Sequence, residues 1–200
     1  VCIVLMIQTL LNTILSVDFL HTFYIFLLYR VVCIFLRILF CNLIMLIEPI
    51  ANILNGAYDK REYPALYEQF NIWNIVKPLK GMRLLDATPV YRNSLLKYRA
   101  LLAAGADLTV GISSVMAYDE GIVGLLRECG VKICSADECG NDEIFDIVMD
   151  CAGAFSFLSP RIGYVELTRS GADAYRDKGL PVFFADGGAI KRIETCLGTG

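Results

Sequence analysis

The sequence predicts an α/β fold: a three-layer, mostly parallel sheet with helices on both faces. From residue 55 onward, short apolar runs of strand length alternate with longer segments of helical periodicity. Glycines such as Gly105 and Gly130 directly follow the helical segments, which is typical of helix ends. Strands and helices that alternate through short turns form parallel sheets, because each crossover places a helix on a face of the sheet.

The expected elements follow one another from residue 59 to the end of the chain. A polar helix with an aromatic stripe comes first, and a Lys-Pro-Leu-Lys-Gly segment connects it to the first strand. The predicted strands are Met82–Ala87, Asp107–Ile112, Val131–Cys134, Phe145–Met149, Gly163–Glu166 and Pro181–Ala185. The predicted helical segments are Asp59–Trp73, Val90–Ala104, Asp119–Cys129, a turn at Asn141–Ile144 and a final helix that carries Lys191. This order is Rossmann-like or flavodoxin-like.

Composition narrows the class of partner. The 200 residues carry a net charge of −3 and no Lys/Arg cluster, so we expect no nucleic-acid partner. The eight cysteines are scattered, and the nearest group, Cys129, Cys134 and Cys139, has no histidine partner. We therefore expect no metal site, and we interpret the cysteines as reduced thiols of a cytoplasmic protein.

Residues 1–54 differ from the rest of the chain and define the predicted boundary between a head, 1–54, and an α/β domain, 55–200. The head has four charged residues and no glycine. It is long enough for one or two membrane helices, which would associate the protein with a membrane. Two alternatives remain open, a buried helical cap and a non-native translation of non-coding DNA, whereas a signal sequence is disfavoured by the length. His21, the only histidine, lies in this head.

Polar residues gather where the predicted strands end. They are Asp86, Thr88, Ser113, Ser114, Asp150, Glu166, Thr168, Arg169, Ser170 and Asp186, with Lys191 one helical turn further on. Parallel sheets bind ligands beyond the carboxyl ends of their strands. Carboxylates suit the hydroxyls of a sugar, and a lysine among carboxylates can move protons. The alternative is that these residues are solvated loop ends and helix caps. No phosphate-binding glycine loop and no Ser-His-Asp triad is present in this domain.

Five segments in the same order resemble the substrate-binding domain of S-adenosylhomocysteine hydrolase (adenosylhomocysteinase), over Ile75–Gly200. The Lys-Pro-Leu-Lys-Gly segment of that family is identical here. Its L-G-A-E-V, L-D-D-G-G-D, E-E-T-T-T-G and P-A-I-N-V-N-D-S-V-T-K segments are similar to Ala103–Leu108, Val148–Gly153, Glu166–Gly171 and Pro181–Lys191. The family is a hydrolase of one-carbon metabolism that oxidises the ribose of its substrate with tightly held NAD.

The resemblance implies roles for individual residues. Glu166 falls on the ribose-binding glutamate and Lys191 on the lysine near the oxidised hydroxyl, so both are candidate catalytic residues. Asp150, Glu166, Thr168 and Asp186 are candidate substrate-binding residues, although Asp186 stands where the family has asparagine. NAD is expected mainly in a further domain beyond Gly200, and the full-length protein is expected to be a homo-oligomer.

The chain also departs from the family. Thr88-Pro89-Val90-Tyr91 stands where the family has its catalytic histidine, and Asp119-Glu120 stands where it has aspartate-histidine. Thr195 and Cys196 replace a catalytic aspartate and an asparagine. Since general acid and base groups each contribute about 10²–10⁴-fold to rate, two hypotheses stay open. One is a divergent NAD-dependent hydrolase acting on a nucleoside-type substrate, and the other is a non-catalytic binding or regulatory protein with the same fold.

Overall fold

The structure is a computed structural model that describes residues 28–31, 48–140 and 143–197. The chain divides into two units, Val1–Ile44 and Met45–Gly200, and the second holds the α/β domain. Most of the predicted apolar head lies outside the described residues. Within the described part of the chain, no helix combines the length and apolar character that crossing a bilayer requires.

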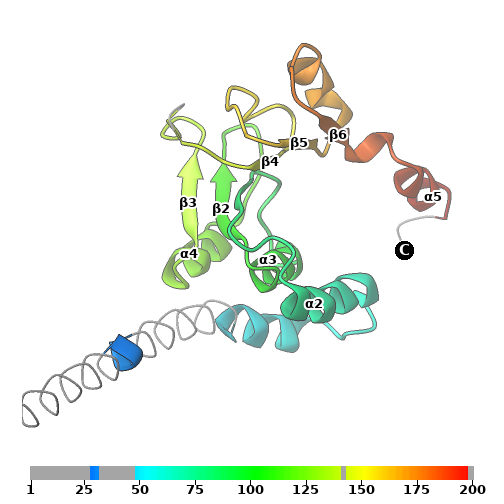
Figure 1. The fold of residues 1–200 in the computed structure, drawn as a ribbon. Coiled ribbons are helices and arrows are strands. Elements are labelled where there is room, and N and C mark those ends of the chain that lie inside the picture. Colours follow the sequence, from blue (N-terminus) through cyan, green and yellow to red (C-terminus); the bar gives the residue numbers. More distant parts are fainter. Residues whose placement is uncertain (1–27, 32–47, 141–142, 198–200) are drawn as a thin grey trace, which may run out of the picture. The chain divides into compact units, whose positions relative to one another are not determined.

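Six strands form one parallel sheet in the order β3-β2-β1-β4-β5-β6 (Figure 1). The strands are β1 (Arg83–Asp86), β2 (Asp107–Ile112), β3 (Lys132–Ser135), β4 (Ile147–Asp150), β5 (Gly163–Glu166) and β6 (Val182–Phe184). The order reverses between β1 and β4, which is the Rossmann-like arrangement. The predicted α/β fold with a parallel sheet is therefore confirmed.

The helices of this unit are α2 (Pro64–Val76), α3 (Ser94–Ala103), α4 (Glu120–Glu128) and α5 (Ala189–Leu197), with 3₁₀ segments η1 (Arg169–Tyr175) and η2 (Ala185–Gly187). Their ends follow local chemistry. Pro64 occupies the first turn of α2, where its missing N–H costs nothing. The Asp119 carboxylate accepts a hydrogen bond from the Ile122 N–H and caps α4. The helical turn predicted at Asn141–Ile144 lies partly outside the described residues.

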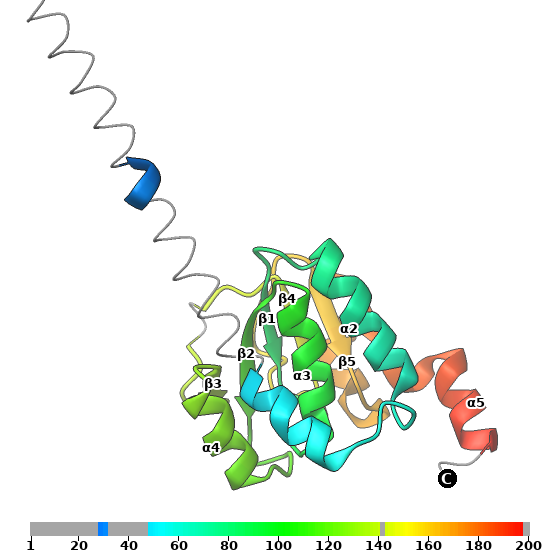
Figure 2. The same cartoon turned by 90° about the horizontal axis from the view of Figure 1, so that it is seen from below.

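Two apolar clusters cover opposite faces of the sheet. The first contains Leu84 and Val110 and is built with residues of α3 and α4, while α2 packs on α3 (Figure 2). The second contains Leu85, Val148 and Tyr164, and is completed by Phe155, Leu158 and Tyr175 from the segment after β4 and from η1. Because successive side chains of a strand point to opposite faces, Leu84 and Leu85 fall into different clusters.

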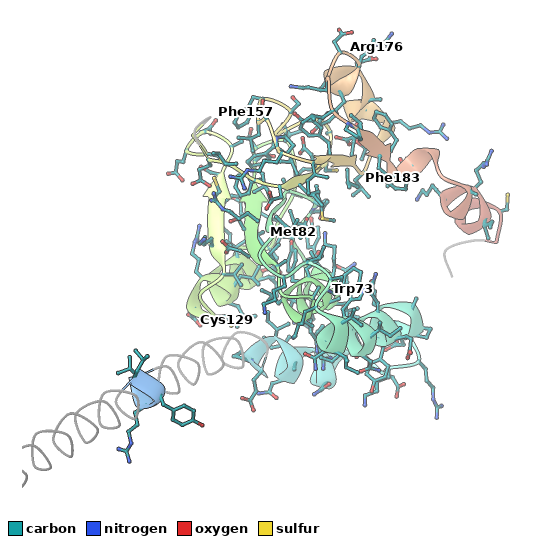
Figure 3. The ribbon with its side chains drawn as sticks, in the orientation of Figure 1. Trp73, Met82, Cys129, Phe157, Arg176 and Phe183 are labelled. Carbon is teal, nitrogen blue, oxygen red and sulfur yellow. The ribbon has the colours of Figure 1, made fainter. Side chains whose placement is uncertain are left out.

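The helix between residues 48 and 57 belongs to the α/β unit rather than to a separate head. Ile50 and Leu54 are fully buried and are part of the first cluster. Figure 3 shows the polarity of the unit along the strands: Phe157 and Arg176 lie at the end where the strands finish, and Cys129 and Trp73 at the other. The carboxyl edge therefore carries the segments that follow β4 and β5.

Candidate functional site

Three acidic side chains at the carboxyl edge of the sheet are completely buried. Asp86 ends β1, Asp150 ends β4 and Glu166 ends β5, and each has 0% exposure. Acidic residues are almost never fully buried unless their charges are compensated. The hydrogen-bond and ion-pair partners of these three acids determine which of their oxygens could bind a ligand.

Glu166 is held by the main chain of two loops. Its Oε1 atom accepts hydrogen bonds from the Ala152 N–H at 3.0 Å, the Thr168 N–H at 2.7 Å and the Thr168 hydroxyl at 2.7 Å. Its Oε2 atom accepts one from the Gly153 N–H at 3.1 Å. Ala152 and Gly153 both have positive φ angles, 57° and 71°, which turn these successive N–H groups toward one carboxylate. Glu166 therefore fixes the loop after β4.

Asp150 lies beside Glu166, because the two residues are register partners on adjacent strands. Its carboxylate accepts hydrogen bonds from the Cys151 N–H at 2.7 Å, the Phe155 N–H at 2.8 Å and the Tyr175 hydroxyl. Burial raises the pKa of Asp150, and these three donors oppose that shift. Burial and the hydrogen bond to Asp150 raise the pKa of Tyr175, so its hydroxyl remains a donor.

Cys151 lies among these acids, with 2% exposure. Burial raises the pKa of its thiol, and the neighbouring charges of Glu166, Asp150 and Asp186 raise it further, whereas a hydrogen bond with Thr168 opposes them. Because the thiolate is disfavoured, Cys151 is a neutral side chain here rather than a nucleophile.

The three remaining predicted site residues are partly exposed. Thr168 follows β5, and its hydroxyl lies 3.0 Å from the Ser170 hydroxyl. Asp186 lies in η2, directly after β6, and Lys191 lies in α5. In Figure 1, α5 extends beyond β6, away from β1–β3. The structure thus joins Thr168 to Glu166 by hydrogen bonds, places Asp150 beside Glu166 on the adjacent strand, and places Asp186 and Lys191 after the neighbouring strand.

Asp86 has a different set of partners. Its Oδ2 atom lies 2.6 Å from Nζ of Lys97, a residue of α3. Apart from this contact, Oδ2 has no polar partner among the described residues, so its compensation is the ion pair. The Oδ1 atom accepts hydrogen bonds from the Thr88 N–H at 3.1 Å and the Thr88 hydroxyl at 2.7 Å, and the Lys97 ammonium donates to that same hydroxyl.

The acids of the edge form two centres on opposite faces of the sheet. Asp86 is the register partner of Met149, which packs with Leu84 on the face covered by α3. Asp150 follows Met149 and therefore points to the other face, as does its partner Glu166. We call these the Glu166–Asp150 centre and the Asp86–Lys97 centre. The single rim of polar residues predicted from the sequence is thus divided.

Lys97 and Tyr175 were missed by the sequence analysis. Both lie in helical segments several residues from the strand ends, and nothing in their spacing shows that they reach back to an acid. A buried aspartate that follows an apolar strand was the available signal, because it requires a compensating donor. A search for cations about one helix turn into the following helix would have found Lys97.

Comparison with known proteins leaves the family open, since no protein-family model and no curated protein matches this chain. The resemblance to S-adenosylhomocysteine hydrolase stays a prediction that depends on the five segments. The residues that it names lie at or after the ends of three adjacent strands, β4, β5 and β6.

Proposed function

We propose that the α/β unit binds a small hydroxyl-bearing molecule of nucleoside type at the carboxyl edge of β4–β6, as a divergent relative of S-adenosylhomocysteine hydrolase. One observation carries the proposal. Asp150 and Glu166, named from separate segments of the sequence, are register partners at the ends of adjacent strands, and Asp186 follows the next strand. Parallel sheets present ligand sites at this edge.

The burial of the four candidate substrate-binding residues separates those that hold the loops from those that contact the ligand. Glu166 and Asp150 are completely buried and shape the loops. Thr168 and Asp186 are partly exposed and are the groups that contact ligand hydroxyls. Glu166 binds a ligand hydroxyl directly only when that hydroxyl replaces the hydroxyl of Thr168 as a donor. Lys191, on α5, assists proton transfer in the catalytic version of this proposal.

The described residues do not fit a dinucleotide at the first strand. The segment 87–93 between β1 and α3 contains no glycine, and α3 begins eight residues after Asp86. A pyrophosphate needs glycines for close approach and a helix that starts at once. NAD binding is therefore expected from residues outside this segment. The proposed function includes no step that uses NAD.

A second candidate is a binding or regulatory protein without catalysis. It is favoured by the Glu166–Asp150 centre, where every carboxylate oxygen already accepts a hydrogen bond from the chain itself. Residues 55–200 also contain no histidine for acid-base work. Both candidates share the ligand site and differ only in turnover.

Isothermal titration of the full chain with adenosine tests the shared site. We expect a Kd below about 1 mM, at least tenfold weaker binding for Asp186→Ala, and unchanged binding for Asp177→Ala, a matched change at an exposed aspartate. Absence of binding by the unmodified chain would overturn the proposal. Hydrolysis of S-adenosylhomocysteine in the presence of NAD, lost in Lys191→Ala, would select the enzyme over the binding protein.

A further inference from the structure

In the Asp86–Lys97 centre, the Lys97 ammonium can donate one more hydrogen bond than its two oxygen contacts use. Nζ of Lys97 contacts Asp86 and the Thr88 hydroxyl, and it lies 5.2 Å from the ring centroid of Tyr98. An ammonium has three N–H donors, and the two oxygen contacts account for two of them. The Lys97 side chain is 28% exposed, whereas Asp86 is completely buried. The lysine therefore joins a buried charge to the surface of the edge.

Two more polar atoms near this edge lack a partner among the described residues. The Tyr98 hydroxyl and the Ser113 hydroxyl are both buried and accept or donate no hydrogen bond there. Tyr98 has 0% exposure and follows Lys97 in α3. Ser113 directly follows β2, the strand next to β1. Buried polar atoms without partners are rare in folded proteins and commonly mark a place for water or a ligand.

We infer that Lys97 is a ligand-binding residue at the carboxyl end of β1, with Asp86 and Thr88 as positioning residues that hold its ammonium. This inference rests on the proposed function and adds a second contact region to it. The centre lies beside the point between β1 and β4 where the strand order reverses. Ligands of open parallel sheets bind at this point.

The net charge of the Asp86–Lys97 centre indicates which kind of ligand oxygen would accept a hydrogen bond from Lys97. Asp86 balances the lysine at 2.6 Å, so the pair is neutral as a whole. Asp150 and Glu166 end the next strands and add negative charge to the same edge. A phosphate would be repelled by these carboxylates. The fitting partner is an uncharged hydroxyl or carbonyl oxygen.

Amine footprinting tests this inference without any substitution. The full chain is acetylated by a water-soluble succinimidyl ester with and without saturating adenosine, and each lysine is quantified by mass spectrometry. We expect adenosine to slow the labelling of Lys97 at least fivefold and to leave Lys132 unchanged. Lys132 is the matched control, because it also pairs with an aspartate, Asp107 at 3.2 Å, but at the opposite ends of β2 and β3.

The outcomes separate the two proposals. If titration shows that adenosine binds while Lys97 is labelled at the same rate, Lys97 is not a ligand-binding residue and the proposed function stands. If adenosine does not bind at all, both are overturned. The double variant Asp86→Asn/Lys97→Met, which removes both charges together, gives a second readout. We expect it to stay folded at the titration temperature and to bind adenosine at least tenfold more weakly, and binding equal to that of the unmodified chain would overturn the inference.

Discussion

Gly171 faces the carboxylate of Glu166 so closely that no side chain fits between them. A Cβ atom at Gly171 would lie 2.7 Å from Oε1 of Glu166 and closer still to Oε2. Glu166 is completely buried and is held by hydrogen bonds from two loops, so it cannot move aside. This glycine is therefore required by the acid, and the segment η1 packs on β5 through that contact.

We expect Gly171→Ala to destabilise the fold by about 2 kcal/mol or more, as other overpacked buried sites do. Urea unfolding followed by circular dichroism measures the change. In a Glu166→Ala background the added methyl group has room, so the same substitution is expected to cost at least 1 kcal/mol less, within the usual range of about 0.5–3 kcal/mol for coupled neighbours.

Gly124→Ala is the matched control for this prediction. Gly124 lies in the middle of α4, and a Cβ atom there meets nothing within 4 Å. Alanine is the better helix former by about 1 kcal/mol, so this variant is expected to be neutral or more stable. A loss of stability equal to that of Gly171→Ala would contradict the role of Glu166.

Glu166→Gln tests whether the charge-bearing oxygens of Glu166 hold the loops. An amide replaces one acceptor oxygen with a donor, which then faces an N–H group of Ala152, Gly153 or Thr168. We expect a loss of about 1–3 kcal/mol of unfolding free energy, the cost of a buried group left without its hydrogen bond. Glu128→Gln, at the exposed end of α4, is expected to change stability by less than about 0.5 kcal/mol.

Asp150 predicts a pH dependence of stability with a defined sign. Burial raises its pKa in the folded state above the ordinary value of 3.8. The folded protein then binds more protons than the unfolded chain between these two pKa values, so this residue's contribution falls as the pH rises through that window. We expect the unmodified chain to lose unfolding free energy relative to Asp150→Asn as the pH rises from 4. Parallel curves would contradict the assignment.

The strands were predictable because their apolar runs are short, and β1, β4 and β5 each end in a carboxylate. β2 and β5 were predicted with their observed bounds, Asp107–Ile112 and Gly163–Glu166, and the other strands within two residues. The covering of the second face was harder to predict. Its buried residues Phe155 and Leu158 lie in an irregular segment that has no period to recognise, and only the packed structure shows that they join Tyr175.

The sequence predicts which edge of the sheet carries the candidate site, but it does not predict which face of the sheet each side chain occupies. Sequence order places Asp86 and Asp150 at the ends of strands, and parallel strands bring those ends to one edge. Which face each side chain takes depends on the register, and Asp86 is opposite Met149 rather than Asp150. A shift of one residue in a strand reverses the face, so strand bounds known to within two residues cannot decide it.

The described cysteines are expected to differ strongly in reactivity. Cys196 is exposed, whereas Cys139 and Cys151 are buried. Burial raises the pKa of Cys134 to about 12, so it is almost entirely protonated at pH 8. We expect iodoacetamide at pH 8 to alkylate Cys196 at least tenfold faster than Cys151, measured by peptide mass spectrometry. Equal rates are expected in concentrated urea, and equal rates in the folded protein would contradict the burial of Cys151.

The ion pair between Asp86 and Lys97 predicts a marked asymmetry between single and double substitutions. Lys97→Met leaves the completely buried Asp86 without a counter-charge, and removal of one partner of a buried pair costs about 3–5 kcal/mol. Asp86→Asn costs less, because the side chain of Lys97 is partly exposed and can be solvated. The double variant removes both charges, and Thr88 can still bond to the asparagine, so we expect it to recover at least half of the loss seen in Lys97→Met. A double-mutant cycle of urea unfolding measures this coupling, and strictly additive losses would show that the two charges do not compensate each other in the folded protein.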